Sequence, residues 1–152
     1  MKICFYLAWM DSTRINRKAF KLSENHALFT EYLKRISRFV ACEVKGAGDL
    51  NHAKTKARTL WICDRGPGAT MMSSEALAGA FKRLLDSGTK ELHIAIGGPD
   101  GFSTEDIKKW TPDLRWSFGP LTLPHELAAV VAGEQIYRVL TILHHLPYHA
   151  GH

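Results

Sequence analysis

The stretch Leu92-His-Ile-Ala-Ile-Gly-Gly-Pro-Asp-Gly101 decides the fold class, because an apolar run opens directly into a glycine-rich loop. The same order occurs earlier, where Leu60-Trp-Ile-Cys63 leads into Asp64 and the loop 65–70. Ser73-Ser-Glu75 and Ser103-Thr-Glu-Asp106 then offer capping sequences for a helix after each loop. A strand, a glycine loop and a helix therefore occur twice, which is typical of a parallel α/β sheet.

Other segments extend this alternation toward both ends of the chain. Apolar and β-branched residues predict strands at 2–8, 39–44 and 114–118. A cap at 23–26 predicts a helix that ends near Ile36, and Pro124 is placed to begin a helix running to about His145. The polar, basic run 51–58 is predicted to be a mobile connection. We therefore predict one α/β domain over residues 1–152, with a mostly parallel sheet and helices on both faces.

The composition indicates one domain with free thiols. The chain has 152 residues, of which 45% are hydrophobic, enough for one core but too few residues for two typical domains. No uncharged apolar run reaches eighteen residues, and Lys2–Met10 lacks a signal-peptide pattern, so we expect a cytoplasmic protein with no membrane partner. Cys4, Cys42 and Cys63 are odd in number and far apart, which favours buried thiols over a disulfide.

A modest basic excess is compatible with an RNA partner. The formal net charge is +5 and the sequence pI is about 9.2. Such a charge attracts RNA through counterion release, but many basic proteins bind no nucleic acid. Charge alone therefore does not decide the partner.

The helix predicted after Pro124 is apolar on more than one side. Its apolar residues surround most of its circumference and include Leu127, Val130, Val131, Ile136, Val139, Leu140 and Leu143. Only Glu134, Gln135 and Arg138 interrupt the pattern. Because the sheet covers only one face, we expect a second subunit to cover the other, which predicts a homodimer.

The loops that follow the predicted strands are the expected ligand site. They are 65–70, 97–101 and 118–123. Ligands of parallel α/β sheets bind beyond the carboxyl ends of the strands, where such loops meet. A generic α/β protein with a nucleotide at these strand ends remains an alternative, and it would be an unknotted monomer.

Three stretches of the sequence, of which the second contains two linked motifs, occur in an order that resembles one known family. They are Ile96-Gly-Gly-Pro-Asp-Gly-Phe102, Leu121-Thr-Leu-Pro-His125, Glu134-Gln-Ile-Tyr-Arg138 and Pro147-Tyr-His149. The chain resembles the ribosomal RNA large subunit methyltransferase H family, within the SPOUT class. The resemblance implies a C-terminal trefoil knot and an S-adenosylmethionine-dependent enzyme. It also implies a homodimer that methylates N3 of a pseudouridine in 23S ribosomal RNA of the ribosome, with no DNA partner.

The resemblance also implies which residues line the cofactor pocket. They are Ile62, Cys63, Gly97, Gly98, Phe118, Gly119, Pro120, Leu121, Thr122 and Leu123. Glycine at 97 and 98 would let the backbone approach a ligand closely. Taken by itself, without the other motifs, this glycine loop is better explained as a tight turn after a strand.

Arg138, Tyr148 and His149 are the candidate catalytic residues. They match family positions near the substrate, and a cation or hydrogen-bond donor there would stabilise the oxyanion that forms as the imide loses its proton. Their alternatives are a surface charge for Arg138 and packing of the chain end for Tyr148 and His149. His125 is interpreted as structural.

The histidines near the C-terminus do not indicate a metal site. His144, His145, His149 and His152 lack regular helical spacing because Pro147 interrupts them, and no cysteine or carboxylate cluster joins them. We predict no native metal.

The chain departs from the family pattern at several places. Ala129 stands where the family usually has arginine, Gly119-Pro120 replaces a serine and a small residue, and Ala150-Gly-His152 ends the chain where a basic residue is usual. Much of a helix between Gly48 and Leu60 is missing. A catalytically weak or inactive cofactor- or RNA-binding homologue, or a methyltransferase for a different RNA, is therefore the alternative function.

Overall fold

The computed structural model describes residues 1–10, 19–46, 50 and 58–150. The connection predicted at 51–58 lies almost entirely outside the described residues, and His152 lies outside them as well. The same holds for the segment between Gly48 and Leu60, in which much of a family helix is absent. Among the helices that are described, none is both long enough and apolar enough to cross a membrane.

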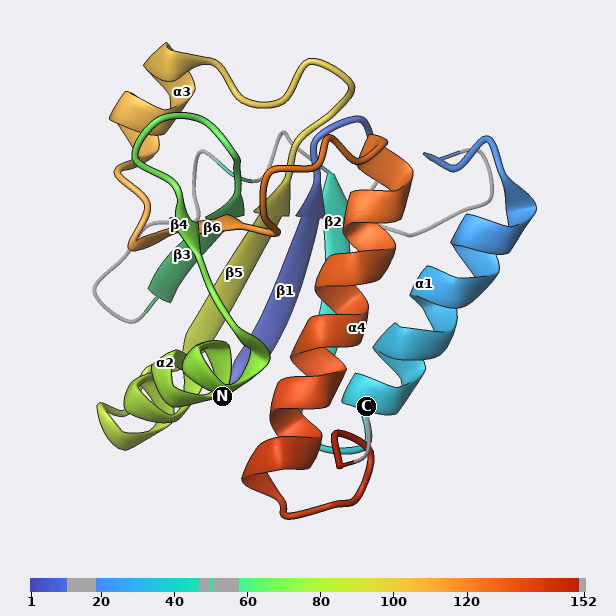
Figure 1. The fold of residues 1–152 in the computed structure, drawn as a ribbon, viewed down its shortest axis with the longest axis vertical. Helices are drawn as coiled ribbons and strands as arrows, with labels where there is room; N and C mark the ends of the chain where they lie inside the picture. Colours follow the sequence, from blue (N-terminus) through green and yellow to red (C-terminus); the bar gives the residue numbers. More distant parts are fainter. Residues whose placement is uncertain (11–18, 47–49, 51–57, 151–152) are drawn as a thin grey trace.

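Six strands form one sheet in the part of the chain that the structure describes. They are β1 (Lys2–Leu7), β2 (Cys42–Gly46), β3 (Arg58–Cys63), β4 (Thr70–Met71), β5 (Glu91–Ile96) and β6 (Leu114–Ser117). Their order is β2-β1-β5-β3-β6-β4, and every neighbouring pair is parallel. The predicted parallel α/β domain is confirmed (Figure 1).

Two strands differ from the sequence prediction. The strand predicted at 39–44 begins only at Cys42, because the amides of Phe39 and Val40 bond to the Ile36 carbonyl and close the end of the preceding helix. The two-residue strand β4 was not predicted, since it is too short to show an alternating pattern.

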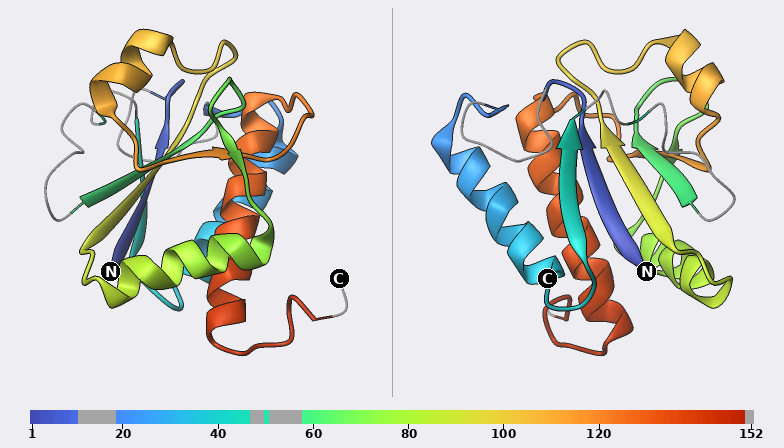
Figure 2. Two further views of the ribbon diagram at one scale, coloured as in Figure 1. Left: turned by 60° about the vertical axis from the view of Figure 1, so that its left-hand side comes forward. Right: turned by 180° about the vertical axis from the view of Figure 1, so that it is seen from behind.

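The helices cover both faces of the sheet, but unequally (Figure 2). They are α1 (Ser23–Ile36), α2 (Ser74–Asp86), α3 (Thr104–Trp110) and α4 (His125–Leu143). The larger core joins α1, α2 and α4 to the face that carries Phe5 and Ile94. On the other face, Phe102 and α3 residues Ile107 and Trp110 pack against a smaller cluster that contains Tyr6.

The predicted helix starts for α2 and α3 have local causes. Ser73 Oγ accepts a hydrogen bond from the Ala76 amide at 3.0 Å, and Ser103 Oγ accepts one from the Asp106 amide at 3.1 Å. Each side chain satisfies a backbone donor that the first helical turn leaves unpaired. These caps fix where each helix leaves the glycine loop before it.

Helix α4 is covered mainly within its own chain. Figure 1 shows it crossing the sheet between α1 and α2, and its residues Ala129, Gly133, Ile136 and Val139 lie inside the core or face its neighbours. A Cβ on Gly133 would lie 3.4 Å from the Cβ of Tyr32, so α1 and α4 approach closely there. The apolar circumference of α4 therefore does not by itself require a second subunit.

Strand β6 lies inside an earlier connection of the chain. It pairs with β3 on one side and β4 on the other, although only residues 64–69 join these two strands. In Figure 1 the green segment after β3 crosses the orange β6. A later strand held within an earlier loop is compatible with a threaded fold, and the trefoil knot itself stays a prediction.

Candidate active site

A pocket of about 290 Å³ opens beyond the carboxyl ends of β3, β5 and β6. Its walls come from the loops that the sequence singles out and from the first turn of α4. They are formed by Cys63, Asp64, Arg65, Ile96, Gly97, Gly98, Pro99, Asp100, Gly101, Phe102, Trp116, Phe118, Gly119, Leu121, Thr122, Leu123, His125 and Ala128. The strand-end loops therefore meet in one cavity, as ligand sites of parallel sheets do.

The loop after β5 makes one wall and depends on glycine. The Gly101 amide donates to the Gly98 carbonyl at 2.9 Å, and Gly101 has a φ of 70°. A Cβ on Gly97 would lie 2.9 Å from Gly101 Cα and 3.0 Å from its carbonyl carbon. Because both neighbours are backbone atoms, any side chain at position 97 would displace the loop.

The segment after β6 makes the opposite wall. Ser117 Oγ accepts from the Gly119 amide at 3.1 Å and donates to the Gly119 carbonyl at 3.3 Å, which holds Gly119 at a φ of 109°. The Trp116 and Phe118 rings pack edge to face, with centroids 4.8 Å apart. This turn directs residues 118–123 across the pocket and into α4.

Asp64 and Arg115 connect the two walls. Arg115 Nε donates to Asp64 Oδ2 at 2.9 Å, and Asp64 Oδ1 accepts from the amides of Arg65 and Gly66 at 2.9 and 3.2 Å. Burial acts to raise the pKa of Asp64, but these hydrogen bonds and the Arg115 charge outweigh it and hold the pKa below its usual value. The carboxylate is therefore ionised and fixed at neutral pH.

Eight of the ten predicted cofactor residues line this pocket. The two exceptions are Ile62, whose side chain is fully buried in the small cluster on the far face, and Pro120, which is exposed outside the lining. The structure thus brings the predicted segments together, while the binding role of each residue stays a prediction.

Several lining residues were not predicted from the sequence. Asp100 lies in the loop 97–101 and Asp64 directly precedes the loop 65–70, so their position after apolar strands was the available signal. His125, interpreted as structural, also lines the pocket, and its ring packs edge to face on Trp9 at 4.5 Å. No local pattern indicated that Trp9 and His125 would meet, because they lie at opposite ends of the chain.

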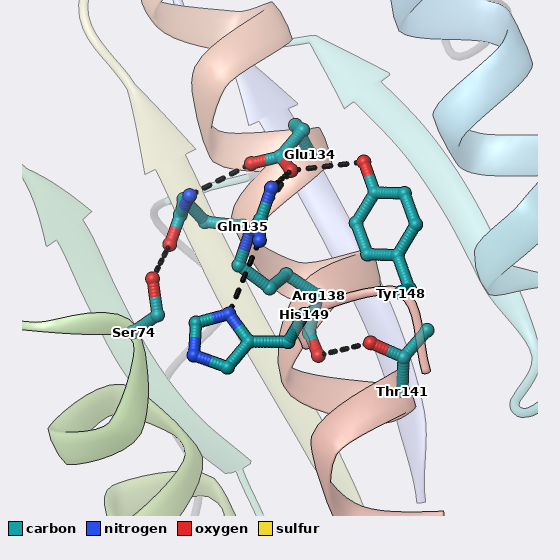
Figure 3. Close-up of polar contacts among 7 residues, drawn as sticks. All are labelled: Ser74, Glu134, Gln135, Arg138, Thr141, Tyr148 and His149. Atoms are coloured by element: carbon teal, nitrogen blue, oxygen red, sulfur yellow. Dashed lines mark hydrogen bonds and ion pairs between the residues drawn. The ribbon is translucent and has the colours of Figure 1, made fainter. Parts of the chain in front are cut away.

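Arg138, Tyr148 and His149 form a second polar cluster, around Glu134 (Figure 3). Arg138 donates to Glu134 Oε1 through Nε at 3.0 Å and Nη2 at 2.6 Å, and the Tyr148 hydroxyl donates to the same oxygen at 3.0 Å. Arg138 Nη1 lies 3.1 Å from His149 Nδ1, and its guanidinium lies 4.9 Å from the centre of the Tyr148 ring. The structure therefore brings the three candidates together.

The cluster and the pocket are separated along α4. Ala128 lines the pocket and Arg138 belongs to the cluster, so the two residues are ten positions, or about 15 Å of helix, apart. Within one chain, Arg138 is therefore not at the pocket.

The described residues contain no group of three or more His, Cys, Asp or Glu side chains placed to hold a metal ion.

At one departure from the family pattern, Ala129 is fully buried in the core. That change therefore affects the packing of α4 rather than an exposed, charged surface.

Comparisons with known proteins show a family likeness over most of the chain. A family model described as "Predicted SPOUT methyltransferase" matches residues 17–149. Proteins named Ribosomal RNA large subunit methyltransferase H match from Koribacter versatilis, with 41% identity over 87% of this chain and 92% of the relative, and from Psychrobacter cryohalolentis, with 35% identity over 81% and 88%. The protein of that name from Deinococcus radiodurans is 36% identical over 86% of this chain and 92% of its own.

One solved structure is also similar. The putative methyltransferase Lpg2936 from Legionella pneumophila, solved with bound S-adenosylmethionine, covers 90% of this chain and 65% of its own, with a TM-score of 0.43 and 16% identity. A likeness this low carries no argument about the present chain.

The parallel sheet, the pocket at its strand ends and the family match together define a methyltransferase of the SPOUT class. Within that class, the chain belongs to the ribosomal RNA large subunit methyltransferase H family.

Proposed function

We propose that this protein transfers a methyl group from S-adenosylmethionine to N3 of a pseudouridine in large-subunit ribosomal RNA, within the ribosome. A ribosomal substrate places the enzyme in the cytoplasm. The observation that supports the proposal most directly is the pocket where the glycine loop after β5 meets the segment entering α4. The similarity to proteins named for large-subunit ribosomal RNA methylation supports the substrate.

The pocket residues fit a bent cofactor that carries a positive charge. Gly97 and Gly101 bring bare backbone to the pocket wall, where a Cβ at position 97 would clash with the Gly101 backbone. Asp64 and Asp100 supply negative charge, and Trp116 and Phe118 supply aromatic surface. When bound, S-adenosylmethionine would supply a methyl group on a sulfonium, so the task of the chain is to position and align the acceptor.

The polar cluster suits the acceptor side of the reaction. An imide nitrogen must lose its proton at or before attack, and the negative charge then spreads onto the neighbouring carbonyl oxygens. Arg138 has five N–H groups, of which three are engaged by Glu134 and His149 among the described residues. The two that remain are available to a phosphate or to those oxygens.

The hydrogen bonds of Tyr148 and His149 limit which of them could accept the proton that the imide nitrogen loses. Tyr148 donates its hydroxyl proton to Glu134, and burial, followed by hydrogen bonding to Tyr32 and Glu134, raises its pKa above the usual value. Tyr148 is therefore a donor and not a base. Because arginine has only donors, His149 Nδ1 accepts from Arg138, and the Nε2 proton goes to Glu75 at 2.9 Å.

A homodimer would bring the pocket of one subunit close to the Arg138 cluster of the other. Since about 15 Å of α4 separates the pocket from Arg138 in one chain, a second copy would bring its cluster to this pocket. Exposed leucines beside the pocket support such a contact, with Leu121 at 72% and Leu127 at 37% exposure. The active site would then combine the pocket of one subunit with the cluster of the other.

The function is tested by calorimetry with S-adenosylmethionine and by methyl transfer to ribosomes from a strain that lacks the enzyme. We expect binding, and one methylated pseudouridine detected by mass spectrometry of the digested RNA. Failure of both would refute the proposal. Cofactor binding without transfer to any ribosomal RNA would instead favour the catalytically weak homologue.

Subunit mixing tests the composite site. Gly97→Leu displaces the loop that forms one wall of the pocket and Arg138→Ala removes the cluster cation, so each variant alone is expected to be inactive. In a mixed dimer one composite site is intact, and random mixing should restore about one quarter of wild-type activity, because half the dimers are mixed and each has one working site. No recovery in demonstrated mixed dimers would show that both parts act from one chain.

A further inference from the structure

We propose that Glu134 is a positioning residue that fixes Arg138 and Tyr148 in the orientation in which they meet the RNA. The inference rests on the proposed function, since it assigns a role within the same acceptor-side cluster. It concerns a residue to which the sequence assigned no role, although Glu134 begins one of the family motifs and interrupts the apolar pattern of α4.

The Glu134 carboxylate is the centre of the cluster (Figure 3). Oε1 accepts from Arg138 Nε, Arg138 Nη2 and the Tyr148 hydroxyl, and Oε2 accepts from Gln135 Nε2 at 2.7 Å. The side chains of Glu134 and Arg138 are only 18% and 14% exposed. A half-enclosed carboxylate with four donors holds each of them in one orientation far better than water would.

The cluster is also anchored to a second helix. Ser74 Oγ, at the start of α2, donates to Gln135 Oε1 at 2.6 Å, which leaves the Gln135 amide group directed to Glu134. Glu75 on the same helix contacts His149 at 2.9 Å. The hydrogen bonds thus run from α2 through Gln135 and Glu134 to the C-terminal residues, so the position of Tyr148 depends on α2 as well as α4.

Glu134 and Arg138 are not an ordinary surface pair. Two other pairs with the same helical spacing are described, Glu31 with Arg35 and Lys82 with Asp86. Glu31 resembles Glu134 in that its partner donates through Nε at 2.9 Å and lies over tyrosine rings. Within the described part of the chain, however, Glu31 accepts only from Arg35, whereas Glu134 also holds Tyr148 from the chain end. Glu31 is therefore a matched control.

The first test compares Glu134→Gln with Glu31→Gln. Glutamine keeps the size of the side chain but removes the charge that fixes the arginine. We expect kcat for ribosome methylation to fall about 10- to 100-fold in Glu134→Gln, because misplaced catalytic groups cost rates of this order. The affinity for S-adenosylmethionine should stay within about twofold, since Glu134 lines no part of the pocket and its hydrogen bonds go to the acceptor-side residues. Glu31→Gln should keep wild-type kcat.

A double-mutant cycle separates positioning from general support of the fold. Arg138→Lys keeps the charge but loses the paired N–H donors that Glu134 holds. If Glu134 acts through Arg138, adding Glu134→Gln to Arg138→Lys should lower kcat by much less than the product of the single effects. The inference would be overturned if Glu134→Gln kept the wild-type kcat, or if the kcat loss of the double mutant equalled the product of the two single losses. It would also be overturned if Glu134→Gln lost as much affinity for S-adenosylmethionine as it lost kcat.

A measurement that does not depend on methyl transfer tests the positioning role of Glu134 separately from the proposed function. The Arg138 Nε–H signal in a nitrogen-proton NMR spectrum should exchange slowly in wild type and in Glu31→Gln, and rapidly in Glu134→Gln. A wild-type protein that shows the protected signal but methylates no RNA overturns the proposed function. One that methylates RNA without the protected signal overturns the positioning role alone.

Tyr148→Phe is the second variant if Glu134→Gln does not fold. It removes one of the four donors and leaves the core unchanged, since the ring stays in place beside Tyr137, whose centroid is 4.7 Å away. We expect a loss in kcat of about three- to tenfold, with a wild-type thermal midpoint. An unchanged kcat would contradict the positioning of Tyr148 by Glu134.

Discussion

Arg115 in β6 forms a two-nitrogen ion pair with Asp64, the first residue after β3, with Nε at 2.9 Å from Asp64 Oδ2 and Nη2 on the same oxygen. The pair joins the connection 64–69 to the strand that lies within it. Gly68 is part of the same arrangement, because a Cβ there would lie 2.8 Å from Arg115 Nη1. One ion pair therefore links the unusual strand order to the wall of the pocket.

Replacing Arg115 should loosen this wall. We expect Arg115→Met to lower the free energy of unfolding by about 1–3 kcal/mol, because a partly buried carboxylate loses its charged donor. Cofactor affinity should fall about tenfold, as the loop after β3 lines the pocket. Chemical denaturation and calorimetry measure the two effects. Arg83→Met, at an exposed position on α2, is the control, and equal stability of both variants would contradict the assigned role.

Asp64 should make stability depend on pH in the acid range. Its folded pKa is lowered, so its stabilising contribution is complete above the unfolded value of about 3.9 and is lost as pH falls through the folded pKa. The difference in unfolding free energy between wild type and Asp64→Asn should be constant from about pH 5 to about pH 8, where Asp64 is ionised in both the folded and the unfolded chain. It should shrink below about pH 4. Denaturation series at several pH values measure it, and a difference that grows on acidification would be the opposite of the expected sign.

Adjacent glycines offer a matched pair of substitutions. Gly97→Ala places a methyl group against the Gly101 backbone, whereas a Cβ on Gly98 meets only Trp9 Cβ at 3.9 Å. We expect Gly97→Ala to cost about 1–3 kcal/mol of stability and at least tenfold in cofactor affinity, and Gly98→Ala to cost less than about 1 kcal/mol. Thermal unfolding and calorimetry provide the comparison. Equal effects of the two substitutions would show that the Gly97 contact is not limiting.

The three thiols should react slowly in the folded protein. Burial raises the pKa of Cys4 to about 11 and that of Cys42 to about 12, and burial also raises the pKa of Cys63. Since the thiolate is the reactive form, labelling by a chromogenic disulfide reagent at pH 7.5 should be slow until the protein is unfolded. The free state of all three cysteines agrees with the absence of a disulfide expected from the sequence. Rapid reaction of one thiol in the native protein would contradict its burial.

Local signals account for what could be predicted from the sequence. Apolar runs that open into glycine loops located β3 and β5, and Ser73 and Ser103 located the starts of α2 and α3, because strand burial and capping involve near neighbours in the chain. The family motifs placed most of the predicted cofactor residues in segments that line one pocket. Strand β4 was not predicted, because two residues are too few to give a local pattern.

By itself, then, the sequence determined the parallel α/β class, the loops that carry the pocket and the family to which the chain belongs. Only the tertiary structure decided that β6 lies between β3 and β4, that α1 and α2 cover much of α4, and that Glu134 gathers Arg138 and Tyr148. It also placed that cluster about 15 Å along α4 from the pocket. The physical reason is that strand order, helix packing and side-chain hydrogen bonds join residues far apart in the chain, whose pairing leaves no local pattern.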